Sequence, residues 1–173
     1  MKGIFSILLC VFLCGFTMQS SNFDVNAKKK AVYIYNFSKY FDWPSNYKQG
    51  TFTIGILGDA PALASELVTM SATKKVGSQD IEVKEFKTMD ALNKCHILYV
   101  TSDNSAAVSK LMGKIKGAST LLVTDKDGLT KLGASINFVI QNNKVMFELS
   151  KSNASKQSLT VSSQLESLAI KVD

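Results

Sequence analysis

The stretch TFTIGILGDAPALASELVTMS, residues 51–71, contains the strand–turn–helix unit on which the fold prediction rests. Thr51–Leu57 is a nearly continuous apolar run, which is typical of a strand buried on both faces. Gly58 and Asp59 close this run. Pro61–Ser71 then carries apolar residues at helical spacing, namely Leu63, Leu67 and Met70. A strand that leads directly into a helix is the repeating unit of a parallel sheet.

The same alternation continues toward the C-terminus. The pattern predicts strands at Ile81–Phe86, His96–Thr101 and Thr120–Thr124. It predicts helices between them, at Met89–Lys94 and Ala106–Lys116. Two more strands, Ser135–Ile140 and Lys144–Leu149, follow without a helix, and the QNN at residues 141–143 predicts a hairpin between them. A short extended stretch at Leu159–Val161 precedes a closing helix from Ser162, a favoured N-cap residue. We therefore predict an α/β fold, a single three-layer domain with a mostly parallel sheet flanked by helices and a C-terminal antiparallel hairpin.

The N-terminus has the pattern of an export signal. Met1 and Lys2 form a short positive region, and the apolar run Ile4–Phe16 follows it. This run is shorter than the roughly 20 residues that span a bilayer. The small-residue pattern Val25-Asn26-Ala27 predicts cleavage after Ala27, and cleavage near Ser20 is the alternative. Residues 1–27 are thus predicted to be an export signal peptide, residues 28–173 the mature domain, and the location periplasmic.

The net charge of +6 comes entirely from lysine, because the chain contains no arginine. Arginine is the usual side chain for clamping phosphates and reading guanine edges. The lysines are also scattered, apart from Lys28–Lys30. This composition argues against a nucleic-acid partner and indicates a solvated lysine surface.

Removal of the signal leaves one cysteine, Cys95, so the mature chain has no partner for an intramolecular disulfide. We interpret Cys95 as a small buried residue at the start of a strand. A disulfide between the Cys95 residues of two chains remains an alternative.

Acidic residues follow three of the predicted strands. Asp59, Asp103 and Asp125 would gather at the carboxyl edge of a parallel sheet, where ligands bind and where three carboxylates could hold magnesium. Aspartate is also the ordinary turn and N-cap residue, which is the simpler interpretation. His96 is the only histidine, so a zinc site has too few ligands. No catalytic constellation emerges, and we predict a protein that is not an enzyme and uses no cofactor or metal.

Lys28–Asp42 is predicted to be a helix that Trp43-Pro44 ends. Its apolar face carries Ala31, Ile34, Ser38 and Phe41. Tyr35 and Phe37 are expected to pack beside that face, whereas Asn36 is a polar residue between them that caps backbone groups or touches a partner. The lysines that open the stretch belong to an unstructured mature terminus or dock on a membrane, and the first interpretation is the plainer one.

Several stretches occur together and in order along nearly the whole mature chain. They are Lys30-Ala31, Tyr35-Asn36-Phe37, Lys39-Tyr40 and Trp43-Pro44, then Gly58-Asp59, residues 95–100 (CHILYV), residues 121–125 (LLVTD), Gly133–Ile140, residues 145–148 (VMFE), residues 159–165 (LTVSSQL) and Leu168-Ala169. This series resembles the YfiR family of small exported proteins, whose members carry a domain of unknown function.

The resemblance implies a role in signalling. Its best-understood members are periplasmic repressors that bind the sensor region of an inner-membrane diguanylate cyclase, lower cyclic-di-GMP signalling and often act as dimers. It therefore implies a membrane-bound signalling partner, a possible homodimer and function by protein contact. The candidate partner- or ligand-binding residues are Tyr35, Asn36, Trp43 and Glu148. A small-ligand sensor module that feeds a membrane receptor or sensor kinase is the alternative function, and its ligand is unknown.

The chain departs from the family pattern at a few positions. Some members pair the cysteine at position 95 with one in the first strand, where this chain has Gly55. Basic residues that could help to hold an anionic ligand near the hairpin are replaced by Met146 and Glu148, and Ser150 stands where asparagine is frequent. The resemblance therefore implies that redox control through this bond is lost.

Overall fold

The computed structural model describes residues 25–173. Most of the predicted export signal, residues 1–24, lies outside the described part, and the boundary after Ala27 stays a prediction. No helix within residues 25–173 is both long and apolar enough to cross a bilayer.

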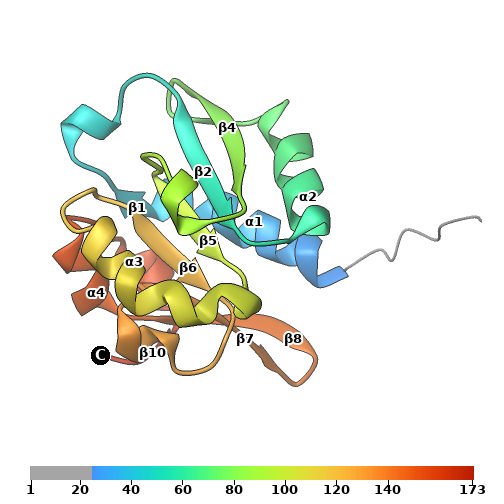
Figure 1. The fold of residues 1–173 in the computed structure, drawn as a ribbon, viewed down its shortest axis with the longest axis vertical. Helices are drawn as coiled ribbons and strands as arrows, with labels where there is room; N and C mark the ends of the chain where they lie inside the picture. The colour runs from blue at the N-terminus through green and yellow to red at the C-terminus, as the bar shows by residue number, and fades with distance from the viewer. Residues whose placement is uncertain (1–24) are drawn as a thin grey trace, which may run out of the picture.

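One eight-stranded sheet forms the centre of the domain, in the order β10-β8-β7-β6-β5-β2-β4-β3 (Figure 1). Its strands are β2 (Phe52–Leu57), β3 (Lys75–Val76), β4 (Gln79–Phe86), β5 (Ile97–Val100), β6 (Leu121–Thr124), β7 (Ile136–Gln141), β8 (Lys144–Leu149) and β10 (Ile170–Lys171). Five adjacent strands of this order, β7-β6-β5-β2-β4, pair in parallel. β8 pairs with β7 as the predicted antiparallel hairpin. Asn142 and Asn143 both have positive φ, as the hairpin turn requires.

Helices cover both faces of this sheet, which confirms the predicted three layers. Figure 1 shows α3 (Val108–Lys114) in front of the strands and α1 (Val25–Tyr40) behind them. α2 (Pro61–Ser71) packs beside α1 in the larger buried cluster. The smaller cluster lies under α3 and the 3-10 turn η4 (Leu129–Leu132). The side chains of β5 alternate between the two clusters, because Ile97 and Tyr99 face the first, and Leu98 and Val100 the second.

The N-terminal helix differs from the prediction at both ends. It begins at Val25, so the three lysines lie within the helix, and the prediction of an unstructured mature terminus is wrong. It ends at Tyr40 because Phe41–Asp42 (β1) pairs with Thr160–Val161 (β9) in a separate two-stranded antiparallel sheet. The predicted helix therefore extends two residues too far.

Three shorter elements also depart from the prediction. Met89–Ala91 is a 3-10 turn (η2), and the expected helix at Ala106–Lys116 is a 3-10 segment, Ser102–Ala107 (η3), followed by α3. A helix that the pattern missed, α4 (Lys151–Lys156), is capped by Ser150, whose hydroxyl accepts from the backbone N–H of Asn153 at 3.2 Å.

The closing helix α5 (Ser163–Glu166) follows Ser162 as predicted. The hydroxyl of Ser162 accepts from the backbone N–H of Leu165 at 3.3 Å. The backbone N–H of Ser162 donates to Tyr40 O at 2.9 Å, and so ties the C-terminal segment to the end of α1.

Candidate functional site

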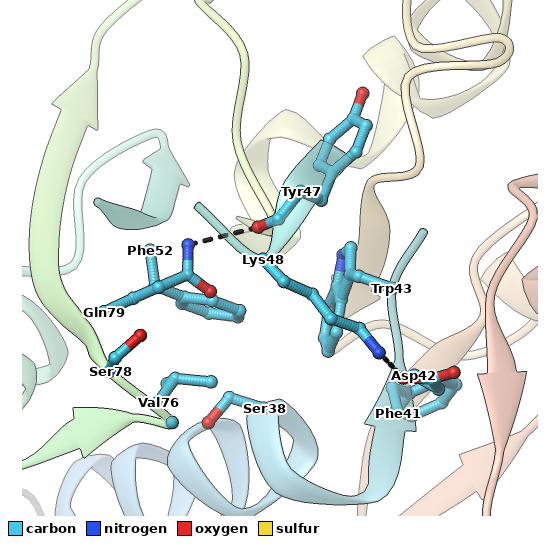
Figure 2. Close-up of a pocket in the computed structure, with 11 residues that line it drawn as sticks. Ser38, Phe41, Asp42, Trp43, Tyr47, Lys48, Phe52, Val76, Ser78 and Gln79 are labelled. Carbon is cyan, nitrogen blue, oxygen red and sulfur yellow. Dashed lines mark hydrogen bonds and ion pairs between the residues drawn. The ribbon is translucent and has the colours of Figure 1, made fainter. Parts of the chain in front are cut away.

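A pocket of about 280 Å³ opens where α1 ends, and Figure 2 shows the side chains around it. Its wall is built by β1, β2, the β3–β4 hairpin and the 3-10 turn η1 (Ser45–Tyr47). The lining residues are Ser38, Phe41, Asp42, Trp43, Tyr47, Lys48, Phe52, Val76, Gly77, Ser78 and Gln79. Segments distant in the sequence thus meet at one place, because the hairpin comes up against the end of α1.

Aromatic rings form the apolar wall of this pocket. Trp43 is only 5% exposed, and its ring lies edge-on against Phe52, with 5.2 Å between centroids, and against Phe41, with 6.3 Å. The indole N–H donates to the backbone O of Ser119 at 2.9 Å. Because this donor is used inside the core, the cavity meets the ring of Trp43 rather than its polar group.

Two polar side chains of the pocket are buried: Ser38, whose hydroxyl donates to the backbone O of Tyr35 at 2.6 Å, and Gln79, with 6% exposure. Its Nε2 donates to the backbone O of Tyr47 and of Gln49, both at 3.1 Å. Its Oε1 accepts no hydrogen bond from any residue of the described part, and in Figure 2 this oxygen points toward the space between the labelled side chains. The pocket therefore contains a hydrogen-bond acceptor beside an aromatic wall.

The mouth of the pocket carries one ion pair. Lys48 Nζ lies 2.6 Å from Asp42 Oδ1, and both side chains are more than half exposed. Figure 2 shows the lysine side chain reaching toward Asp42 past Trp43. The two charges compensate each other, so the mouth has little net charge.

His96 lies behind the aromatic wall. Its Nδ1 accepts from the backbone N–H of Thr53 at 3.0 Å, so Nε2 carries the proton and donates to Tyr47 O at 2.9 Å. Its ring also stacks on Phe52 at 4.3 Å. Burial lowers the pKa of His96 below 6.5, the backbone hydrogen bond to Tyr47 opposes this, and the charge of Lys94 lowers the pKa further. His96 is therefore a neutral structural residue with both ring nitrogens occupied.

The three aspartates at the strand ends do come together. Asp59, Asp103 and Asp125 line a second cavity, of about 290 Å³, together with Lys30 and Tyr99. Asp125 Oδ2 pairs with Lys30 Nζ at 2.7 Å and accepts from the Tyr99 hydroxyl at 2.5 Å. Among residues 25–173, no three His, Cys, Asp or Glu side chains are placed to hold a metal ion. The half-buried carboxylate of Asp125 is thus paired with a lysine that the sequence pattern predicts to lie in an unstructured mature terminus.

Comparison with known proteins identifies the family. The family model described as YfiR/HmsC-like (DUF4154) matches residues 27–170. The chain belongs to the YfiR/HmsC-like family. This is a family of regulatory proteins. No individual curated protein matches the chain.

The four candidate partner- or ligand-binding residues do not converge on one site. Of the four, Trp43 alone lines the aromatic pocket. Tyr35 is half-buried, with the ammonium of Lys39 4.4 Å from its ring centroid, and Asn36 is half-buried with no side-chain hydrogen bond to a described residue. Glu148 accepts from Asn137 Nδ2 at 3.0 Å beside a different cavity.

Gly55, where some YfiR family members have a cysteine, lies directly beside Cys95. Cys95 is buried, and a Cβ added at Gly55 would lie 2.7 Å from its Sγ. Burial raises the pKa of the Cys95 thiol to about 11, partly offset by the charge of Lys84, while Glu82 raises it slightly more. A second cysteine at position 55 would thus meet Cys95, whereas glycine leaves an unreactive thiol.

Proposed function

We propose that this protein is an exported, non-enzymatic regulator that acts in the periplasm. It contacts an inner-membrane signalling protein of the diguanylate cyclase type and represses it. The observation that carries this proposal is the YfiR/HmsC-like match over residues 27–170, which spans nearly the whole described domain. A homodimer is the proposed assembly, and light scattering of the purified protein tests it.

The chemistry of the described residues supports function by contact. Asp125 is neutralised by Lys30, both ring nitrogens of His96 are occupied, and Cys95 is a thiol with a raised pKa. Catalysis by a nucleophile needs an activated group beside a free base. These titratable groups are instead paired with one another, hydrogen-bonded to the backbone or buried.

A deletion strain tests the proposed repression. Loss of the gene should raise cellular cyclic-di-GMP, and the full-length chain supplied on a plasmid should restore the lower level. A version that lacks residues 2–24 is the matched control, because it keeps the whole of α1 without most of the predicted signal and should fail to repress. Unchanged cyclic-di-GMP in the deletion strain would refute a repressor of this pathway.

A small-ligand sensor module is the second candidate, and the aromatic pocket favours it. Thermal-shift screening with aromatic amino acids, nucleotides and metals separates the two functions. A regulator that acts by contact alone should show no stabilisation by free amino acids, nucleotides or metals. A saturable rise in melting temperature with one of them would support the sensor instead.

A further inference from the structure

We propose that the aromatic pocket beside Trp43 receives one aromatic side chain with an N–H or O–H donor, a tyrosine or tryptophan, from the protein partner. This inference rests on the proposed function, because it assigns the contact through which the regulator would hold its partner. It names a ligand class for the pocket in Figure 2.

The size and wall of the pocket select a single ring. A cavity of about 280 Å³ is at the lower limit of small-molecule sites, so it suits one side chain better than a nucleotide or cofactor. Phe41, Trp43 and Phe52 already pack edge-on, and a further ring can join them in the same geometry. Tyrosine and tryptophan are also the aromatic residues that most often anchor interfaces in such pockets.

Gln79 favours a ligand side chain that carries a hydrogen-bond donor. Its amide nitrogen is held by two backbone carbonyls, which fixes the orientation of the side chain and directs Oε1 to the cavity. Oε1 is open to the cavity and accepts from no described residue, so a ligand with an N–H or O–H donor can form a hydrogen bond there. A phenylalanine ring fills the same space but supplies no hydrogen-bond donor.

The mouth selects a peptide over a free amino acid. A free amino acid carries a positive and a negative group, and each needs a partner. Asp42 and Lys48 already pair with each other at 2.6 Å, so the mouth offers no uncompensated charge. A backbone without terminal charges, as in a protein segment, loses nothing there. The rim residues Gly77 and Ser78 are exposed, so a segment can approach the pocket from solvent.

Nuclear magnetic resonance tests the pocket directly, because the chain has one tryptophan and hence one indole N–H signal. We expect N-acetyl-tyrosinamide to shift the signals of Trp43 and Gln79 in a saturable way. N-acetyl-phenylalaninamide should bind about 3- to 10-fold more weakly, because it lacks the donor. Free tyrosine should cause no saturable shift, because Asp42 and Lys48 already pair and leave its charged groups without a partner.

Two matched variants locate the site. Val76→Phe places a ring at the half-buried pocket wall and should abolish these shifts, while Val68→Phe, at an exposed position on α2, should leave them unchanged. Melting temperatures within a few degrees of wild type establish that both variants fold. Equal binding of the phenylalanine amide, no shift at millimolar ligand, or unchanged binding in folded Val76→Phe would overturn the proposal. Saturable binding of free tyrosine would overturn the assignment to a protein partner.

The proposal and the function fail in different ways. Full repression of cyclic-di-GMP by folded Val76→Phe would refute the pocket contact and leave the regulator intact. Saturable binding of the capped tyrosine, combined with no cyclic-di-GMP change in the deletion strain, would refute the repressor and leave the pocket assignment in place.

Discussion

Trp43→Ala should act mainly on stability. Trp43 is 5% exposed and packs against Phe41, Phe52 and His96, and its indole N–H bonds to Ser119 O. Truncation of a buried tryptophan costs about 3–5 kcal/mol, against about 5–15 kcal/mol for the whole domain. At about 2–4 °C per kcal/mol for a domain of this size, the melting temperature should fall by roughly 6–20 °C.

Circular dichroism measures this change without the tryptophan signal. Trp43→Phe is the control, because it keeps most ring contacts and loses the hydrogen bond to Ser119, which is worth about 1 kcal/mol. It should therefore melt only a few degrees below wild type. Partner binding by Trp43→Ala should decline together with stability. A Trp43→Ala protein that melts like wild type but fails to bind its partner would refute the structural role and leave Trp43 with the pocket contact alone.

Three further predictions concern the buried Cys95 and His96. Cys95→Ser should leave regulation and its response to oxidants unchanged, because the thiol is buried with a raised pKa; a prominent reducible dimer on non-reducing gels of the wild-type protein would contradict this. Gly55→Cys should form a disulfide with Cys95 on oxidation, which mass spectrometry of alkylated protein detects, and two free thiols after oxidation would refute the predicted contact. The folded state holds His96 neutral with a pKa below 6.5, so the unfolded chain takes up the proton first, and stability should fall as the pH drops below about 6.5. Urea midpoints at pH 7.5 and 5 measure it, and equal midpoints would contradict the bonds of His96 to Thr53 and Tyr47.

The central strands could be predicted because each is an apolar run between turn residues. β5 and β6 are buried throughout, and the helices between strands show helical spacing, so the parallel pattern is readable. Elements stabilised by distant pairing could not be read in this way. The two-residue strand β1 leaves the helical pattern because it pairs with β9, more than a hundred residues away. The helix α4, KSNASK, has no apolar periodicity and is set by its Ser150 cap.

The candidate site was predictable only in part, for the same reason. Trp43 stands out because it is the only tryptophan of the chain and a proline follows it. The three aspartates were correctly expected at one edge of the sheet. Gln79 gives no signal in the sequence, because its role depends on backbone carbonyls of the segment around Tyr47. The ion pair between Lys30 and Asp125 could not be predicted, because the two residues are 95 positions apart along the chain.

Photo-crosslinking in living cells tests the central claim of contact regulation most directly. A photoreactive phenylalanine analogue is placed at Ser78, on the exposed rim of the pocket, and at Val68, on α2, as the control. Adducts from the membrane fraction are identified by mass spectrometry. We predict an inner-membrane protein with a diguanylate cyclase domain crosslinked from position 78 and not from position 68. No adduct with a membrane signalling protein from position 78, or the same adducts from both positions, would contradict the account.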